Sequence, residues 1–174
     1  MSEKKILFGP SQSNAILDLL QSIFVAELIC PSTELSFFFG WMSDVELLNN
    51  QASEFSSLEP DWANSMICLS DVFKALLKRG CKIFVVLKDV EHNRKVEKEI
   101  RKRCQEFTDM LKIYWDEKEH KKVIVGEDFV LEGSMNLTKN GLNINGESIT
   151  FNTNLQDVSI WQQEVSSNLG DLTK

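Results

Sequence analysis

Residues 120–138 read HKKVIVGEDFVLEGSMNLT, and this stretch decides how the rest of the chain is interpreted. Two short apolar runs, at 122–125 and from 129 to about 133, lie on either side of a Glu-Asp turn. Apolar runs of this length, bounded by turn residues, predict two adjacent strands. The polar residues of the stretch therefore lie just before the first strand and just after the second.

Four of these polar side chains are expected to face one point. His120 and Lys122 are two residues apart at the start of the first strand, so both side chains leave the same face. Ser134 and Asn136 are also two apart, at the end of the second strand, and can point the same way. Together they offer a nucleophile or proton carrier, a positive charge and two neutral donors, a set that suits a tetrahedral oxyanion.

The rest of the chain alternates between strand and helix patterns. These patterns predict strands at 5–8, 34–42, 81–87, 112–115 and 143–154, and helices at 13–29, 70–80, 90–111 and 159–169. Residues 49–65 are polar and are expected to form a long loop or a partly helical insertion. The alternation indicates an α/β fold, with a mixed β-sheet flanked by helices in a single domain that spans residues 1–174.

The composition is that of a globular protein. Of the 174 residues, 43% are hydrophobic and 26% are charged, and no apolar stretch approaches the roughly 20 residues that span a bilayer. The first residues do not resemble a signal peptide, so we expect a cytoplasmic protein without stable membrane association. No two of the four cysteines have C-x-x-C spacing, and we expect buried free thiols and no metal site.

The charge is unevenly distributed along the chain. The net charge is −7, yet residues 74–122 carry 15 of the 19 basic residues and only nine of the 26 acidic ones. Such an acidic protein does not coat nucleic acid indiscriminately, but a local basic groove could hold a phosphate backbone. A solvated helix face of mixed charge is the plainer interpretation of the same segment.

The polar residues of 120–138 resemble the H-x-K-x4-D and G-S-x-N signature of the phospholipase D superfamily. The matching residues are His120, Lys122, Gly133, Ser134 and Asn136. Five residue types at constrained spacing rarely coincide by chance, which makes the signature specific. The resemblance implies that His120, Lys122, Ser134 and Asn136 form a catalytic phosphate site, with Gly133 in support.

Two carboxylates bear on the resemblance, Glu147 as a match and Glu127 as a departure. Glu147 follows Asn136 by eleven residues and matches the acid that, in this family, hydrogen-bonds the catalytic imidazole. Glu127 stands where the family has Asp, a carboxylate that supports the structure rather than contacting phosphate. The helix and strand expected over 69–87 also resemble the segment that precedes the family's motif.

The family's mechanism needs two histidines, one to attack phosphorus and one to protonate the leaving oxygen. This chain has one motif, and its other histidine, His92, is interpreted as a surface residue of a charged helix. Small bacterial nucleases of the superfamily place two identical motifs across a two-fold axis. The resemblance therefore implies a homodimer with a shared active site, acting without a metal or other cofactor.

Three function classes remain open. The first is a nuclease, with DNA a more favoured partner than RNA, and with Trp62, Lys121 and Lys139 as possible nucleic-acid contacts. The second is a phospholipase or another small-diester hydrolase, and the third is a non-catalytic nucleic-acid- or protein-binding module that keeps the fold. The acidic total also suggests that a protein partner could supply targeting.

Overall fold

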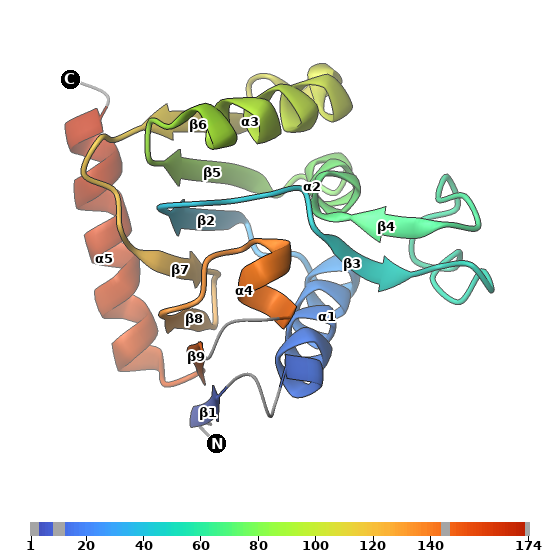
Figure 1. Ribbon diagram of the computed structural model, residues 1–174, viewed down its shortest axis with the longest axis horizontal. Helices are drawn as coiled ribbons and strands as arrows, with labels where there is room; N and C mark the ends of the chain where they lie inside the picture. The colour runs from blue at the N-terminus through green and yellow to red at the C-terminus, as the bar shows by residue number, and fades with distance from the viewer. Residues whose placement is uncertain (1–3, 9–12, 144–146, 173–174) are drawn as a thin grey trace.

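The computed structural model describes residues 4–8, 13–143 and 147–172 (Figure 1). The elements are β1 (Lys4–Phe8), α1 (Ser13–Ile29), β2 (Glu34–Phe39), β3 (Glu46–Asn49), β4 (Met66–Cys68), α2 (Leu69–Lys78), β5 (Lys82–Leu87), α3 (Glu91–Arg103), the 3₁₀ helix η1 (Gln105–Phe107), β6 (Leu111–Trp115), β7 (Lys122–Val125), β8 (Val130–Gly133), α4 (Lys139–Asn143), β9 (Ser148–Asn152) and α5 (Leu155–Leu172).

Within the described residues, seven strands form the main sheet, in the order β1-β9-β8-β7-β2-β5-β6. Strands β2, β5 and β6 run parallel, as expected for strands joined through crossover helices. Strands β7, β8, β9 and β1 are added antiparallel to one another, beginning with β7 against β2. The α/β fold with a mixed sheet is therefore confirmed.

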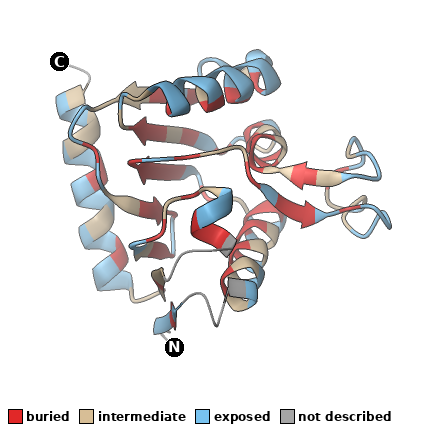
Figure 2. Cartoon of the chain, viewed as in Figure 1, coloured by how far each residue is buried: buried red, intermediate tan, exposed pale blue. Residues whose placement is uncertain are grey.

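Helices cover both faces of the sheet (Figure 1). On one face, the central strands pack against α1, α2 and α3 in a large core that includes Phe24, Phe37 and Phe73. On the other face, Val123 and Val130 pack against the apolar side of α5. Figure 2 shows the result, with buried central strands between helices whose outer sides are exposed.

The boundaries differ from the sequence prediction where the chain changes direction. The helix expected over 90–111 ends at Arg103, because Cys104 leaves helical geometry and the apolar pattern continues through η1 into β6. The strand expected over 34–42 ends at Phe39, where the chain turns away from the sheet. Part of the strand region expected over 143–154 lies outside the described residues, and β9 occupies Ser148–Asn152.

The 49–65 insertion lies between the strands of a small hairpin that the sequence did not predict. Strands β3 and β4 pair antiparallel and project beside α2, away from the main sheet (Figure 1). Asn50 is fully buried and organises the loop, because its side chain accepts from the Phe55 amide at 2.8 Å and donates to the Ala63 carbonyl at 3.1 Å.

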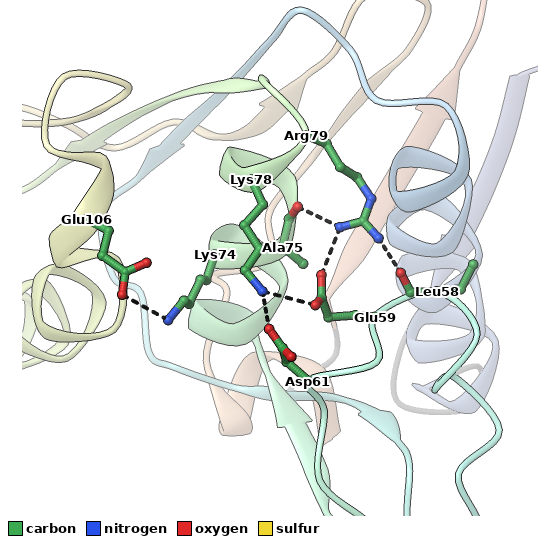
Figure 3. Close-up of polar contacts among 8 residues, drawn as sticks. All are labelled: Leu58, Glu59, Asp61, Lys74, Ala75, Lys78, Arg79 and Glu106. Carbon is green, nitrogen blue, oxygen red and sulfur yellow. Dashed lines mark hydrogen bonds and ion pairs between the residues drawn. The ribbon is translucent and has the colours of Figure 1, made fainter.

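Ion pairs fasten this insertion to α2 (Figure 3). The buried carboxylate of Glu59 accepts from Lys78 Nζ at 3.0 Å and from Arg79 Nη1 at 3.1 Å. Arg79 also donates to the carbonyls of Leu58 and Ala75. Burial alone would raise the pKa of Glu59, but the hydrogen bonds and charges of Lys78 and Arg79 outweigh it and hold this pKa below its ordinary value.

The cysteines are free but not uniformly buried. Burial raises the pKa of Cys81 and that of Cys104 to about 12, and burial with nearby carboxylates raises that of Cys68 to about 11. Cys30, just after α1, is exposed, which corrects the expectation that all four thiols are buried.

The Glu59 cluster predicts a pH-dependent contribution to stability. Glu59→Gln keeps the side-chain shape but removes the charge, and we expect it to lower the free energy of unfolding at pH 7 by about 1–2 kcal/mol. Because the folded-state pKa is lowered, the difference from wild type is full above the ordinary glutamate value of 4.5 and disappears as pH falls through the folded-state value. Denaturant titrations at several pH values measure it.

Asp61→Asn is the matched control, since Asp61 binds the same Lys78 ammonium at 2.5 Å but is exposed. It should leave the unfolding midpoint unchanged. Equal destabilisation by the two variants, or a Glu59→Gln effect that does not diminish as the pH is lowered, would contradict the role given to Glu59.

Candidate active site

One edge of the main sheet gathers the polar residues predicted from the sequence. Strand β7 pairs antiparallel with both β2 and β8, with Phe39 opposite Lys122 and Glu132 opposite Val123. The start of β7 therefore lies beside the ends of β2 and β8. The end of β5, parallel to β2, reaches the same edge.

His120 and Lys122 lie at the start of β7. His120 is exposed, and Lys122 is half-buried with its Nζ donating to the His120 carbonyl at 2.6 Å. Lys122 lines a small cavity with Phe39 and Gly133, on the sheet face that carries the larger core. The ammonium is thus held at the sheet edge beside the end of β8.

Ser134 and Glu147 form a second anchored pair. Ser134 Oγ donates to Glu147 Oε2 at 2.5 Å and accepts from the Ser148 amide at 3.0 Å. Glu147 is therefore at the site, beside a residue of the G-S-x-N motif. The contact between Glu147 and the imidazole of His120, implied by the family resemblance, stays a prediction.

Asn136 is oriented by the backbone of the loop after β2. Its Oδ1 accepts from the Trp41 amide at 3.1 Å. Because a backbone N–H can only donate, this bond fixes the oxygen toward Trp41 and leaves the side-chain nitrogen, a pure donor, for a ligand oxygen. Gly40 lies between the two motifs: a Cβ added there would be 3.8 Å from Asn136 Oδ1 and 3.9 Å from the Cα of His120.

Gly133 is required by the close approach of β9. A Cβ at Gly133 would lie 2.0 Å from the Ser148 carbonyl oxygen and 2.9 Å from the Cα of Ile149. Both neighbours are backbone atoms of the paired strand, which cannot move aside as a flexible side chain can. This glycine thus lets Ser134 sit directly against β9, with the Ser134 amide donating to the Ser148 carbonyl at 3.0 Å.

Asn93 supports the site, and the sequence analysis missed it. Its fully buried side chain accepts from the Met42 amide at 3.0 Å and donates to the carbonyls of Gly40 at 2.9 Å and Lys88 at 2.8 Å. It therefore ties the loop after β2 to the beginning of α3. A polar residue following the strand and turn at 81–89 was the available signal, but nothing in the spacing indicated its partners.

A cavity of about 680 Å³ adjoins Asn136. Its lining residues are Trp41, Ser43, His92, Asn136, Thr138, Lys139 and Asn140. His92 is exposed, as the sequence predicted, but it lies at this cavity, with Nε2 3.0 Å from Ser43 Oγ. Of the three residues suggested as nucleic-acid contacts, Lys139 is at the cavity.

The other two suggested contacts lie elsewhere. Lys121 points to the α5 side of the sheet, where its Nζ donates to Asn168 at 3.1 Å and lies over the ring of Phe38, because adjacent residues of an extended chain face opposite ways. Trp62 is half-buried against the large core and lines a separate cavity beside α2. The structure therefore does not bring Lys121 or Trp62 to the site.

Glu127 lies at the other end of β7 from His120. It follows β7 in the turn to β8, where its Oε2 accepts from the Thr33 amide at 3.1 Å and its own amide donates to Ser32 Oγ at 3.0 Å. These bonds join the turn to the segment between α1 and β2. Glu127 is thus placed to act on the fold and not on a ligand at the site.

The described residues hold neither a metal cluster nor a membrane-spanning helix. Within residues 4–8, 13–143 and 147–172, no group of three or more His, Cys, Asp or Glu side chains is arranged to hold a metal ion. No helix among those residues is long and apolar enough to cross a membrane.

Gly133→Ala tests the close approach of β8 and β9. We expect it to lower the free energy of unfolding by about 2 kcal/mol or more, because the added methyl meets backbone that must shift. Gly40→Ala is the control: its methyl would meet its nearest neighbour, the Glu119 carbonyl oxygen, at 3.4 Å and should be tolerated. Chemical denaturation of both variants measures the difference, and a Gly133→Ala protein as stable as wild type would show that the strands are not so tightly apposed.

Comparisons with known proteins identify relatives. Residues 60–168 match the family model described as cardiolipin synthase, PLD-like domain. No curated protein matches the chain. Among solved structures, NucT from Helicobacter pylori is 14% identical with a TM-score of 0.62, and covers 99% of this chain and 96% of its own.

Two further structures share the fold. Nuc from Salmonella typhimurium, a phospholipase D family member, is 15% identical with a TM-score of 0.61, over 99% of this chain and 96% of that one. The phosphatidylserine synthase of Haemophilus influenzae is 15% identical with a TM-score of 0.57, over 97% of this chain but 38% of that one. The family match spans more than half of the sequence and includes both motifs, so the chain belongs to the phospholipase D-like family.

Proposed function

We propose that this protein is a metal-independent phosphodiesterase, and specifically a nuclease that cleaves DNA through a phosphohistidine. The observation that carries the proposal is the meeting of the two motifs at one sheet edge, where β7 brings His120 and Lys122 beside the end of β8. Family membership supports phosphodiester chemistry in general. The overall likeness to NucT and Nuc is a likeness of fold, which makes a nuclease the first choice among diesterases.

The first chemical step would be attack on phosphorus. A ring nitrogen of neutral His120 forms the N–P bond while the bond from phosphorus to the leaving oxygen breaks, and a second histidine gives that oxygen its proton. The Lys122 ammonium and the Asn136 amide nitrogen would stabilise the charge that develops on the non-bridging oxygens. Ser134, held by Glu147, would be a further neutral donor or would position that carboxylate toward the imidazole.

The second step would return the enzyme to its starting state. Water attacks the phosphohistidine, the N–P bond breaks, and the second histidine takes a proton from that water, which restores its protonated state. We propose that this histidine is His120 of a second copy in a two-fold homodimer, because the sequence holds one H-x-K motif. Two Lys122 ammoniums would then face one phosphodiester.

A lipid diester is the second candidate substrate, favoured by the phosphatidylserine synthase among the structural neighbours. That enzyme is much longer than this chain, which spans 38% of it. The coverage of NucT and Nuc is nearly complete in both directions, and we therefore rank nucleic acid first. Cytoplasmic localisation and a targeting partner stay expectations.

Cleavage assays in EDTA test the proposed chemistry. Wild-type protein should cut single- or double-stranded DNA, and His120→Ala should abolish cutting because no nucleophile remains. Lys122→Ala should reduce kcat/KM by roughly 100-fold or more, as for loss of one donor to a developing oxyanion, about 3 kcal/mol. Lys121→Ala is the control, since Lys121 faces α5, and it should retain activity.

Cutting that needs added metal, or that survives in His120→Ala, would contradict the mechanism. Hydrolysis of phospholipid vesicles without cleavage of any DNA or RNA would favour the second candidate.

Light scattering together with subunit mixing tests the shared site. We expect a dimer, and mixing wild-type with excess His120→Ala protein should reduce activity per wild-type subunit toward zero as mixed dimers form. An active monomer would overturn the shared site and would make His92, at the adjoining cavity, the candidate for the second histidine.

A further inference from the structure

The cavity beside Asn136 combines an exposed aromatic side chain with polar edges. Trp41 has an exposed fraction of 44%, although large aromatic side chains are usually placed where they bury most of their surface. It lines the cavity together with Asn136, the motif residue that is a candidate phosphate donor. A ligand that contacts both residues would place a flat apolar group against Trp41 and a nearby phosphate at Asn136.

The backbone around Trp41 is held in place on both sides. The Trp41 amide donates to Asn136 Oδ1, and the Met42 amide donates to Asn93 Oδ1. The Ser43 amide donates to the Leu137 carbonyl at 2.8 Å, next to an isolated bridge between Met42 and Leu137. An indole on so fixed a loop loses little additional freedom when it contacts a ligand.

Hydrogen-bonding groups also line the cavity. His92 and Ser43 are bonded to each other there, Thr138 lines it just before α4, and Asn140 lines it from within α4. Lys139 adds a positive charge to the same lining. A lining with this charge and these donors and acceptors fits a heterocycle with polar groups on its edge better than a hydrocarbon chain.

We propose that this cavity is a nucleobase subsite, in which one base of a single-stranded nucleic acid stacks on Trp41 next to the phosphate bound at the catalytic motif. The inference rests on the proposed function and names its substrate class. Stacking on an aromatic side chain needs the face of the base, which is covered in a stacked duplex, so the subsite favours single strands. Hydrogen bonds from His92, Ser43 or Asn140 would reach the edge of the same base.

Binding measurements test the subsite separately from catalysis. A fluorescein-labelled ten-residue oligothymidylate is titrated with His120→Ala protein, which should not cut it, and anisotropy gives the Kd. Adding Trp41→Leu to that background keeps an apolar side chain but removes the aromatic face, and should weaken binding about tenfold or more. Trp41→Phe should restore most of the affinity.

Ile160→Ala is the control, because Ile160 is an exposed apolar side chain on α5, which covers the opposite face of the sheet. It should leave the Kd unchanged. A labelled duplex of the same length should bind with an affinity that Trp41→Leu alters less than twofold.

Three results would overturn the subsite: equal affinity of the Trp41→Leu and parent proteins for the oligonucleotide, an equal effect of Ile160→Ala, or Trp41-dependent binding to phosphatidylglycerol vesicles but not to the oligonucleotide. A different result would contradict the proposed nuclease function without contradicting the subsite. If the oligonucleotide binds in a Trp41-dependent way but the wild-type protein cleaves no diester, the nuclease proposal is overturned and the nucleobase subsite is supported.

Discussion

The double antiparallel pairing of β7 is the constraint on which the site depends. One four-residue strand is bonded on one side to β2 and on the other to β8, and its register with both is fixed by buried side chains on two faces. A slip of one residue would turn Lys122 toward α5 and move the valines that pack there to the opposite face. The packing that fixes the register of β7 therefore also determines the direction in which the Lys122 ammonium points.

The support of the site comes from elements that carry none of the motif. Asn93 at the start of α3 fixes the loop after β2 through buried hydrogen bonds, and the Trp41 amide of that loop orients Asn136 through an exposed one. Such a shell reduces the reorganisation needed when charge develops on a ligand. The Glu59 cluster, by contrast, secures an insertion beside α2 and contributes to stability without lining the cavity at Asn136.

The sequence indicated the parts of the site that are local in the chain. His120, Lys122, Ser134 and Asn136 belong to one hairpin, so spacing and strand alternation were enough to bring them together. Trp41, His92 and Asn93 reach the same edge through the parallel pairing of β2 with β5, a contact between segments far apart in sequence, which residue spacing does not encode. Lys121 was suggested for its charge alone, and strand alternation turns its side chain to the α5 face, away from Lys122.

The uneven burial of the cysteines has a practical consequence. Three thiols are buried or half-buried with raised pKa values and are poorly reactive, whereas Cys30 is exposed. Cys30 precedes β2, and the loop with Trp41 follows it, so the thiol and that loop are separated by the length of a six-residue strand, roughly 20 Å. A maleimide dye would therefore attach selectively at the opposite end of the sheet, giving a spectroscopic reporter on the native chain that leaves the site untouched.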